Sequence, residues 1–501
     1  MPDETQPPVE SASDLPGILD PPTTLGGILK KLGPGLIIAG AIVGSGELIA
    51  TTLVGAKAGF VLMWLIILGC LVKVFVQIEF GKYAIINGKT TLDGMNEVPG
   101  PRFGGPKHAR VNWVNWFWLI FIIVALVQVG GIIGGVGQAV SIQLPLTGSG
   151  QAVNAFHDEQ IQATLAGNAD TVDAEAPTSN DPVFWALIIT IPSIVILVAG
   201  RYRLIQNIST ALVALFTLVT IGNLILLQSI PDWRVSAEEL LSGMTFRIPP
   251  GKGLETALFA FGIIGVGATE LIQYPYWCIE KGYARWTGPR EESDAWKQRA
   301  EGWIRVLKWD AWCSMIVYTF ATIAFYLLGA AILHRADLKP EGPNLVRTLG
   351  EMYVPVFGGW AQGVFLFGAF AVLYSTFFVA TASHARTLAD AVRVFGLSKG
   401  GERSYVFWTR VFCVVLPLMF LGSFAFISQS PEILVLAGGF MGALMLPLLG
   451  VTALYGRYRR GDARLTPGPI WDIFLWVSVV GLFIAGGWAL YIKIIEPLFA
   501  G

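Results

Sequence analysis

The chain has 501 residues, of which 54% are hydrophobic and 14% are charged, and its mean hydropathy is +0.61. These values lie outside the usual range of soluble globular proteins and indicate a polytopic membrane protein embedded in a lipid bilayer. A net charge of −1 argues against a nucleic-acid partner, which would require a basic surface. The sequence also carries no Walker A pattern, dinucleotide fingerprint or HExxH motif, so we expect no enzyme activity and no bound cofactor.

Taken in chain order, residues 1–32 are acidic and rich in proline, which predicts a flexible cytoplasmic tail. About eleven apolar stretches follow, each long enough to cross a bilayer as a helix, so the predicted fold class is an all-α membrane protein. They span residues 33–56, 59–84, 113–140, 182–200, 205–229, 254–279, 309–333, 357–384, 404–428, 431–455 and 470–495.

The loops between these stretches differ in charge. Lys and Arg gather in the loops after the second, fourth, sixth, eighth and tenth stretches, and such loops usually remain in the cytoplasm. The loop after the third stretch, residues 143–182, contains no Lys or Arg and is predicted to be external. With eleven spans, this pattern predicts a cytoplasmic N-terminus and an external C-terminus, in the cell (inner) membrane.

A short internal repeat marks the start of each half of the chain. Val43–Ile49 aligns without a gap with Val266–Ile272, and each segment has small residues before a glutamate, Glu47 or Glu270, and Leu-Ile after it. If the first five spans repeat as the next five, the odd number of spans in each repeat gives the second copy the opposite orientation in the membrane. Many secondary transporters have such inverted repeats, and the first helix of each repeat is discontinuous.

This repeat predicts the organisation of the chain. The first five-helix repeat covers residues 33–229, an external connection covers 230–253, and the second, inverted repeat covers 254–455. Residues 456–501 hold the eleventh helix and the C-terminus. The first and sixth helices are expected to be unwound where the glycines lie.

The two glutamates predict a cation site at membrane depth. Freed backbone groups in a membrane must be satisfied by protein, water or a bound ion, and carbonyl and carboxylate oxygens suit hard divalent cations. Glu47 and Glu270 are the expected metal ligands, and two close carboxylates would also tend to share a proton, which would leave as the cation enters. Alternatively, each glutamate is a protonated packing group that is hydrogen-bonded to a neighbour. The predicted substrate-binding residues are Gly44, Ser45, Gly46, Glu47, Ala268, Thr269, Glu270, Leu271 and Gln273.

Five further polar residues inside predicted spans are secondary candidates. Lys73 is expected to pair with an acid across the bundle, in a structural role more readily than in transport. Tyr374 and Ser375 suit helix packing and hydrogen bonding. His384 lies near the cytoplasmic end of its span and could change charge near neutral pH. Gln128 is a long polar residue of the third span.

Over residues 30 to 495 the sequence resembles the Nramp family of divalent-metal transporters. The resemblance rests on Gly33-Pro34-Gly35, on the second span and its distance from the first glycine motif, on Gly267-Ala268-Thr269 and on Leu446-Pro447. It implies a LeuT-type fold with inverted five-helix repeats, and transport of divalent cations.

The core motifs depart from the family pattern. The family's Asp-Pro-Gly-Asn is Gly44–Glu47 here, so Gly44 stands where the family has its metal-binding aspartate. The family's Ala-x-x-Met-Pro-His is Ala268–Gln273, which lacks the methionine, and Gln128 lies in a third helix that lacks the family's proton-linked acids. Loss of a soft sulfur ligand shifts the expected preference toward Mg²⁺ or Mn²⁺.

The sequence therefore predicts a secondary-active transporter of divalent metal cations that works by alternating access, with protons as a further expected partner. An alternative is a proton-linked transporter of a small organic solute or amine, in which the same glutamates bind a proton or an ammonium group and no metal is carried. A channel or membrane sensor is the third reading, which interrupted helices in both halves disfavour.

Overall fold

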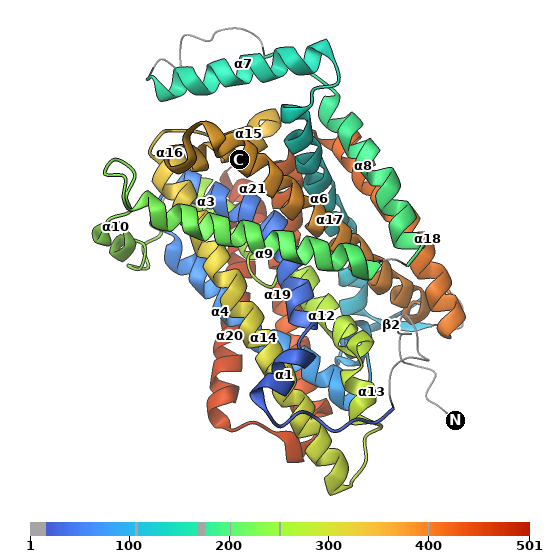
Figure 1. The fold of residues 1–501 in the computed structure, drawn as a ribbon. Coiled ribbons are helices and arrows are strands. Elements are labelled where there is room, and N and C mark those ends of the chain that lie inside the picture. Colours follow the sequence, from blue (N-terminus) through green and yellow to red (C-terminus); the bar gives the residue numbers. More distant parts are fainter. Residues whose placement is uncertain are drawn as a thin grey trace.

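The computed structural model describes residues 17–105, 109–167, 176–200, 202–249, 252–398 and 400–500. These residues form a bundle of long helices (Figure 1), and each of the eleven apolar stretches predicted from the sequence coincides with helix. The first half comprises α2 (Pro34–Ile42), the π-helical segment η1 (Val43–Thr51), α3 (Thr52–Ala58), α4 (Met63–Asn87), α6 (Trp113–Gln143), α8 (Asp181–Val198) and α9 (Tyr202–Leu227). The second half comprises α11 (Lys252–Phe261), α12 (Ala268–Lys281), α14 (Asp294–Leu328), α17 (Ala361–Val394), α18 (Glu402–Gly422), α19 (Pro431–Tyr455) and α20 (Pro469–Leu490).

Shorter elements connect or extend these helices. The short α-helices are α1 (Leu25–Lys31), α5 (Thr91–Glu97), α7 (Gly148–Leu165), α10 (Ala237–Ser242), α13 (Tyr283–Thr287), α15 (Leu345–Gly350), α16 (Val354–Phe357) and α21 (Glu496–Ala500). Further π-helical turns cover Gly329–His334, Ser423–Ile427, Gly456–Arg460 and Tyr491–Ile495, and 3₁₀ turns cover Gly342–Asn344, Glu351–Tyr353, Gly358–Trp360 and Ala463–Leu465. Strands β1 (Arg102–Gly104) and β2 (Arg110–Asn112) pair antiparallel, with Phe103 opposite Val111.

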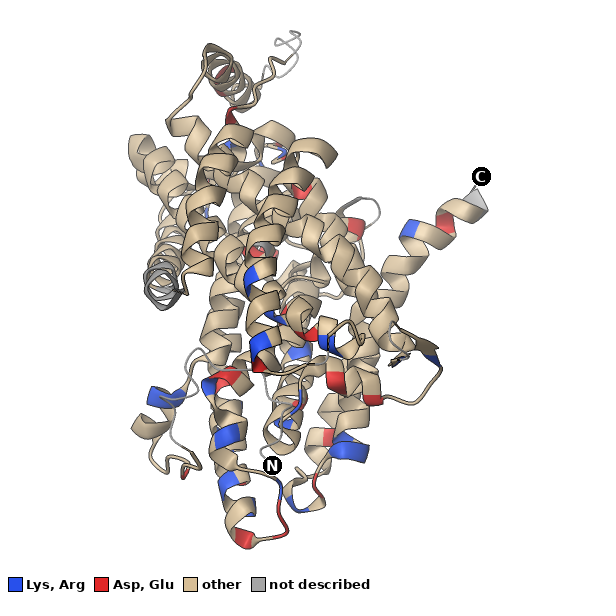
Figure 2. Ribbon diagram, turned by 90° about the vertical axis from the view of Figure 1, so that its right-hand side faces the viewer, with Lys and Arg blue, Asp and Glu red and all other residues tan. Residues whose placement is uncertain are grey.

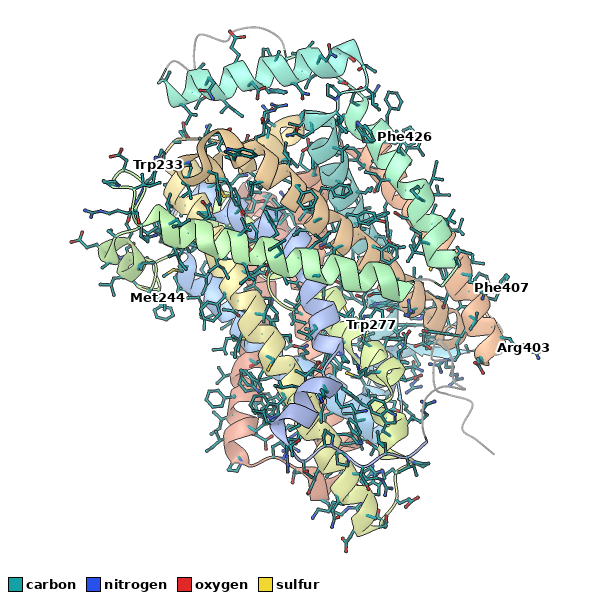
Figure 3. All side chains as sticks on the ribbon, in the orientation of Figure 1. Trp233, Met244, Trp277, Arg403, Phe407 and Phe426 are labelled. Atoms are coloured by element: carbon teal, nitrogen blue, oxygen red, sulfur yellow. The ribbon has the colours of Figure 1, made fainter. Side chains whose placement is uncertain are left out.

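Eight of the described helices are long and apolar enough to cross a membrane, by length and composition, and a bent pair, α1 with α2, raises the number to nine. The sixth predicted span is not among them because it is interrupted between α11 and α12. The outer helices expose large apolar side chains. Phe407 and Phe426 of the α18 region point outward (Figure 3) and are 59% and 90% exposed. Such a surface is suited to lipid, and the chain is an integral membrane protein.

Charged residues are distributed unevenly along the bundle. Most of the Lys, Arg, Asp and Glu residues lie in the lower half of the view in Figure 2. α7, from the loop without Lys or Arg, lies at the opposite end of the molecule from α1 and α13 (Figure 1). This separation agrees with the charge pattern of the loops.

Part of the predicted flexible tail is ordered. Residues 1–16 lie outside the described residues, but α1 begins after Thr24, whose hydroxyl accepts a hydrogen bond from the Gly27 amide. The Leu19 carbonyl accepts a hydrogen bond from the indole of Trp303, at 3.0 Å, and the Leu19 amide donates to the Trp286 carbonyl. The predicted tail is thus in contact with buried tryptophans of α13 and α14 through the backbone of Leu19.

The first and sixth helices are both interrupted, but in different ways. In the first, the expected unwound segment is π-helical instead, and the hydroxyls of Thr51 and Thr52 donate to the carbonyls of Gly46 and Glu47, five residues earlier. The wider winding keeps most backbone groups paired inside a buried segment. The sixth helix does break: α11 ends at Phe261, α12 begins at Ala268, and Gly265 between them has a φ of +59°.

The break is packed tightly against α19. A β carbon added at Gly262 would lie 2.0 Å from the Gly439 carbonyl oxygen and 2.6 Å from the Ala443 nitrogen. One added at Gly439 would lie 2.5 Å from the Phe259 carbonyl oxygen. The two backbones approach closely only because these positions carry no side chain.

We therefore expect Gly262→Ala to destabilise the protein, because over-packing a closed contact typically costs about 1–3 kcal/mol. Thermal unfolding of the purified protein in detergent measures the effect. Gly487→Ala in α20 is the control, since an added β carbon there has no neighbour within 4 Å and alanine is the better helix former. Equal melting temperatures for the two variants would contradict this packing.

Candidate functional site

Glu47 lies in the π-helical segment of the first helix and is fully buried. Its Oε1 accepts hydrogen bonds from the Thr322 hydroxyl of α14, at 2.7 Å, and from the Gly265 amide in the break of the sixth helix, at 3.3 Å. Its Oε2 has no hydrogen-bond partner among the described residues. A buried polar atom without a partner is costly, so this oxygen marks a place where a ligand could bind.

Glu270 stands in the first turn of α12, on the other side of the same break, and is partly exposed. Its Oε2 accepts a hydrogen bond from the Thr269 hydroxyl at 2.8 Å. The amino-terminal end of a helix favours negative charge. Glu47, which accepts a hydrogen bond from Gly265 in the break, and Glu270, which stands in the first turn after it, thus both lie at the interruption of the sixth helix.

Lys73 of α4 is fully buried and does not form the predicted pair with an acid. Its ammonium donates to the carbonyl oxygens of Phe261 and Ile264, at 2.5 and 2.6 Å, and lies 4.6 Å from the centre of the Phe261 ring. Both carbonyls are freed where α11 ends, and freed carbonyls attract a cation more directly than a distant carboxylate does.

The glycines of the first interruption are in close contact with other helices. A β carbon at Gly44 would lie 2.1 Å from the Thr376 hydroxyl oxygen of α17, and one at Gly46 would lie 3.0 Å from the Ile263 carbonyl oxygen. The aspartate that the family resemblance places at position 44 therefore does not fit this packing. The side chain of Ser45 lies outside the described residues.

The remaining residues of the sixth-helix motif have separate partners. The Ala268 amide donates to the Gly262 carbonyl at 3.1 Å and closes the turn of the break. Leu271 is fully buried, so the position that carries methionine in the family pattern holds an apolar packing residue. Gln273 and His384 lie together, with Nε2 of Gln273 3.1 Å from Nδ1 of His384. This contact joins α12 to α17.

The other secondary candidates have partners on outer or neighbouring helices. The Tyr374 hydroxyl lies 3.1 Å from the Ser193 hydroxyl of α8. Gln128 of α6 packs against Gly438 of α19, where an added β carbon would meet its side chain at 2.5 Å. Ser375 is buried in α17. Contacts to Glu47 come instead from α14 and from the break.

Sequence reasoning missed the residues of α14 that support Glu47. Thr322 donates to Glu47, and Tyr318, one turn earlier, has a buried hydroxyl without a hydrogen-bond partner among the described residues and a ring that faces Gly265. A signal was present, since polar residues recur every four positions in this stretch and four-residue spacing places them on one helix face. The series comprises Asp310, Ser314, Tyr318, Thr322 and Tyr326, all of them buried.

No group of three or more His, Cys, Asp and Glu side chains within the described ranges could hold a metal ion. A cation at Glu47 and Glu270 would therefore need backbone carbonyl or hydroxyl oxygens to complete its ligands.

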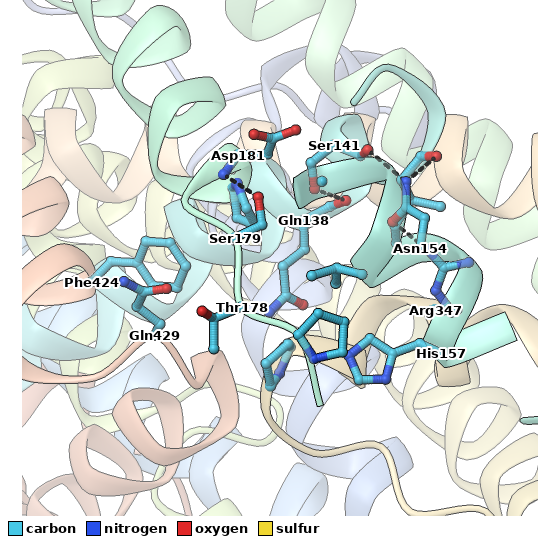
Figure 4. Close-up of a pocket in the computed structure, with 16 residues that line it drawn as sticks. Gln138, Ser141, Asn154, His157, Thr178, Ser179, Asp181, Arg347, Phe424 and Gln429 are labelled. Atoms are coloured by element: carbon cyan, nitrogen blue, oxygen red, sulfur yellow. Dashed lines mark hydrogen bonds between the residues drawn. The ribbon is translucent and has the colours of Figure 1, made fainter. Parts of the chain in front are cut away.

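A separate cavity of about 90 Å³ lies under α7 (Figure 4). Its lining includes Gln138, Asn154, His157, Asp181 and Arg347, and none of the site residues predicted from the sequence. The Arg347 guanidinium donates to the Asn154 side chain at 2.6 Å and forms an ion pair with Asp158 of α7. Nδ1 of His157 lies 3.3 Å from the Gln160 side chain, whereas its buried Nε2 has no partner in the part of the chain that the structure describes.

An apolar helical bundle with two interrupted helices around a buried carboxylate is the architecture of an inverted-repeat membrane transporter. Solved structures have the same fold. A manganese transporter of Eremococcus coleocola, in complex with an aromatic bis-isothiourea compound, aligns with a TM-score of 0.63 at 15% identity, over 95% of this chain and 90% of that one. Mhp1, a nucleobase-cation-symport-1 family transporter in a closed conformation, aligns with a TM-score of 0.50 at 16% identity, over 96% of each chain. The predicted LeuT-type fold is confirmed.

Sequence comparison gives the family. The profile of the family described as natural resistance-associated macrophage protein-like, Nramp, matches residues 171–491. An uncharacterized protein of Pasteurella multocida is 22% identical over 394 residues, which are 75% of this chain and 73% of that protein. The chain belongs to the Nramp family, as its motifs indicated.

We expect Thr322→Val to destabilise the protein by about 1–3 kcal/mol, because it leaves the buried Glu47 carboxylate with one backbone donor. Thermal unfolding in detergent again provides the measurement. Thr319→Val, on the same helix, is the matched control, since the Thr319 hydroxyl donates to the Met315 sulfur and makes no hydrogen bond to Glu47. Comparable losses in both variants would show that Glu47 does not depend on Thr322.

Burial lowers the pKa of His157 below its ordinary value. The folded protein thus holds His157 neutral while an unfolded histidine becomes charged below about pH 6.5. The resulting stability is present above that pH and is lost as the pH falls below it. We expect the amide protection of α7, relative to α6, to fall between about pH 7.5 and 5.5. His157→Gln should remove this dependence, and His334→Gln should keep it; an unchanged profile in His157→Gln would refute the assignment.

Proposed function

We propose that the chain is a secondary-active transporter of divalent metal cations and that Glu47 and Glu270 are ligands of the transported ion. One observation carries the proposal: Oε2 of Glu47 is buried and unpartnered in the part of the chain described, at the point where both interrupted helices meet. An oxygen in this position is satisfied when a cation binds. Membership of the Nramp family and the fold shared with a manganese transporter support this reading.

The available ligands favour hard cations. The two carboxylates, neighbouring backbone carbonyls and hydroxyl groups such as that of Thr269 all offer oxygen. Leu271, at the family's methionine position, offers no sulfur. Oxygen ligands suit Mg²⁺ and Mn²⁺, whereas thioethers select softer metals, so we propose that the protein prefers Mg²⁺ or Mn²⁺.

Burial of Glu47 supports transport by alternating access. Glu47 is closed off from solvent, so a cation reaches its carboxylate only when the helices around the interruptions move. The break in the sixth helix and the glycines facing it provide the flexible segment. We further propose an inner-membrane location with the N-terminus in the cytoplasm and the C-terminus outside, on the basis of the basic loops.

Uptake of Mg²⁺ and Mn²⁺ into proteoliposomes tests the proposal. Wild-type protein should give saturable uptake, faster than that of Cd²⁺, and the Glu47→Gln/Glu270→Gln double variant should fall to the level of protein-free liposomes. Glu432→Gln is the matched control, because Glu432 is also buried with an unpartnered carboxylate oxygen among the described residues, yet contacts Gly342 rather than either interruption.

Absence of Mg²⁺ and Mn²⁺ uptake by folded wild-type protein, with and without a pH gradient, would contradict the proposal. Proton-linked transport of an organic solute or amine through the same carboxylates would then be the function to test. Equal uptake by the double variant and wild type would instead reject Glu47 and Glu270 as ligands.

A further inference from the structure

The contacts of Lys73 describe a small cation site. Two carbonyl oxygens, from Phe261 and Ile264, lie 2.5 and 2.6 Å from its nitrogen, and the Phe261 ring lies on a further side at 4.6 Å. Carbonyl groups at the end of a helix carry partial negative charge, and the face of an aromatic ring also attracts cations. The surroundings of the ammonium are those that proteins build for a monovalent cation.

The break in the sixth helix leaves two buried carbonyls that need a hydrogen-bond donor or a cation. The carbonyls of Phe261 and Ile264 lie where α11 ends, in a region closed off from solvent. In the first interruption the corresponding need is met by π-helical winding and by the hydroxyls of Thr51 and Thr52. The second interruption has Lys73, although burying an ammonium is among the least favourable choices inside a membrane. Lys73 therefore places a positive charge against these two carbonyls where the first interruption uses neutral hydroxyls.

The charge of Lys73 also acts on the proposed metal ligands. Glu47 and Glu270 both interact electrostatically with Lys73, and Cys70, one turn earlier on α4, lies beside it. With both glutamates ionised, Lys73 balances one of their two negative charges when no metal is bound. A free monovalent cation would do the same, but it would have to be taken up and released in each cycle.

We infer that the Phe261 and Ile264 carbonyls form a monovalent-cation site, and that the chain fills it permanently with the tethered ammonium of Lys73. The transporter then carries its own counter-cation and needs no free Na⁺ or K⁺. The inference rests on the proposed function for its role in transport, but occupancy of the site is tested without transport.

Removing the side chain should open the site to a small free cation. We expect methylammonium chloride to raise the melting temperature of purified Lys73→Ala in detergent by about 2 °C or more over choline chloride at equal ionic strength. Wild type and Lys73→Arg, which keep a tethered cation, should show no such difference. Lys82→Ala is the matched control, because Lys82 is a buried lysine of the same helix that pairs with Glu79 away from the break.

A methylammonium effect on Lys73→Ala no larger than on Lys82→Ala would overturn the inference. Recovery of folded Lys73→Ala only when methylammonium is present throughout purification would support it. If Lys73→Ala cannot be recovered at all, the melting temperature of the wild type is compared in NaCl, KCl and choline chloride. A higher melting temperature in NaCl or KCl than in choline chloride would overturn the inference, and equal melting temperatures would support it. These outcomes are separate from failure of Mg²⁺ and Mn²⁺ uptake, which would count against the proposed function alone.

Discussion

The structure depends on one constraint: backbone groups released at the two interrupted helices must find partners inside the protein, away from water. Each repeat supplies a partner to the interrupted helix of the other repeat. α4, the second helix of the first repeat, supplies Lys73 to the break in the sixth helix. α14, the second helix of the second repeat, supplies Thr322 to Glu47 in the first helix. Side chains of each repeat thus form hydrogen bonds to the interrupted helix of the other repeat, and these bonds connect the two halves of the bundle.

This crosswise arrangement determines what the centre can bind. Glu47, Glu270 and Lys73 give two carboxylates and one ammonium in a region of low dielectric, where an unpaired charge is strongly unfavourable. The Gly265 amide ties Glu47 to the break itself, so a ligand on Glu47 would act directly on the hinge of the sixth helix. Under the proposed function, this contact would link cation binding to helix movement, as alternating access requires.

The sequence predicted the elements that depend on hydrophobicity and on local repetition. All eleven apolar stretches form helices, and the alignment of Val43–Ile49 with Val266–Ile272 pointed to Glu47 and Glu270, which both lie at the break of the sixth helix. What it could not predict depends on tertiary contact. A glycine in the sequence indicates that a helix can deform, but not which form it takes. The π-helical winding depends on tertiary contacts: Gly44 packs against Thr376, and the hydroxyls of Thr51 and Thr52 donate to backbone carbonyls. Likewise, the partners of Lys73 are main-chain atoms, which a pattern of side chains does not reveal.

The central claim is that a divalent cation binds at Glu47, and its most direct test is titration of the purified protein with Mn²⁺, followed by the electron paramagnetic resonance signal of the free ion. We predict saturable binding of one Mn²⁺ per chain, competed by Mg²⁺ and lost in Glu47→Gln. Equal binding by Glu47→Gln and wild type, or no binding by folded wild type, would contradict the account.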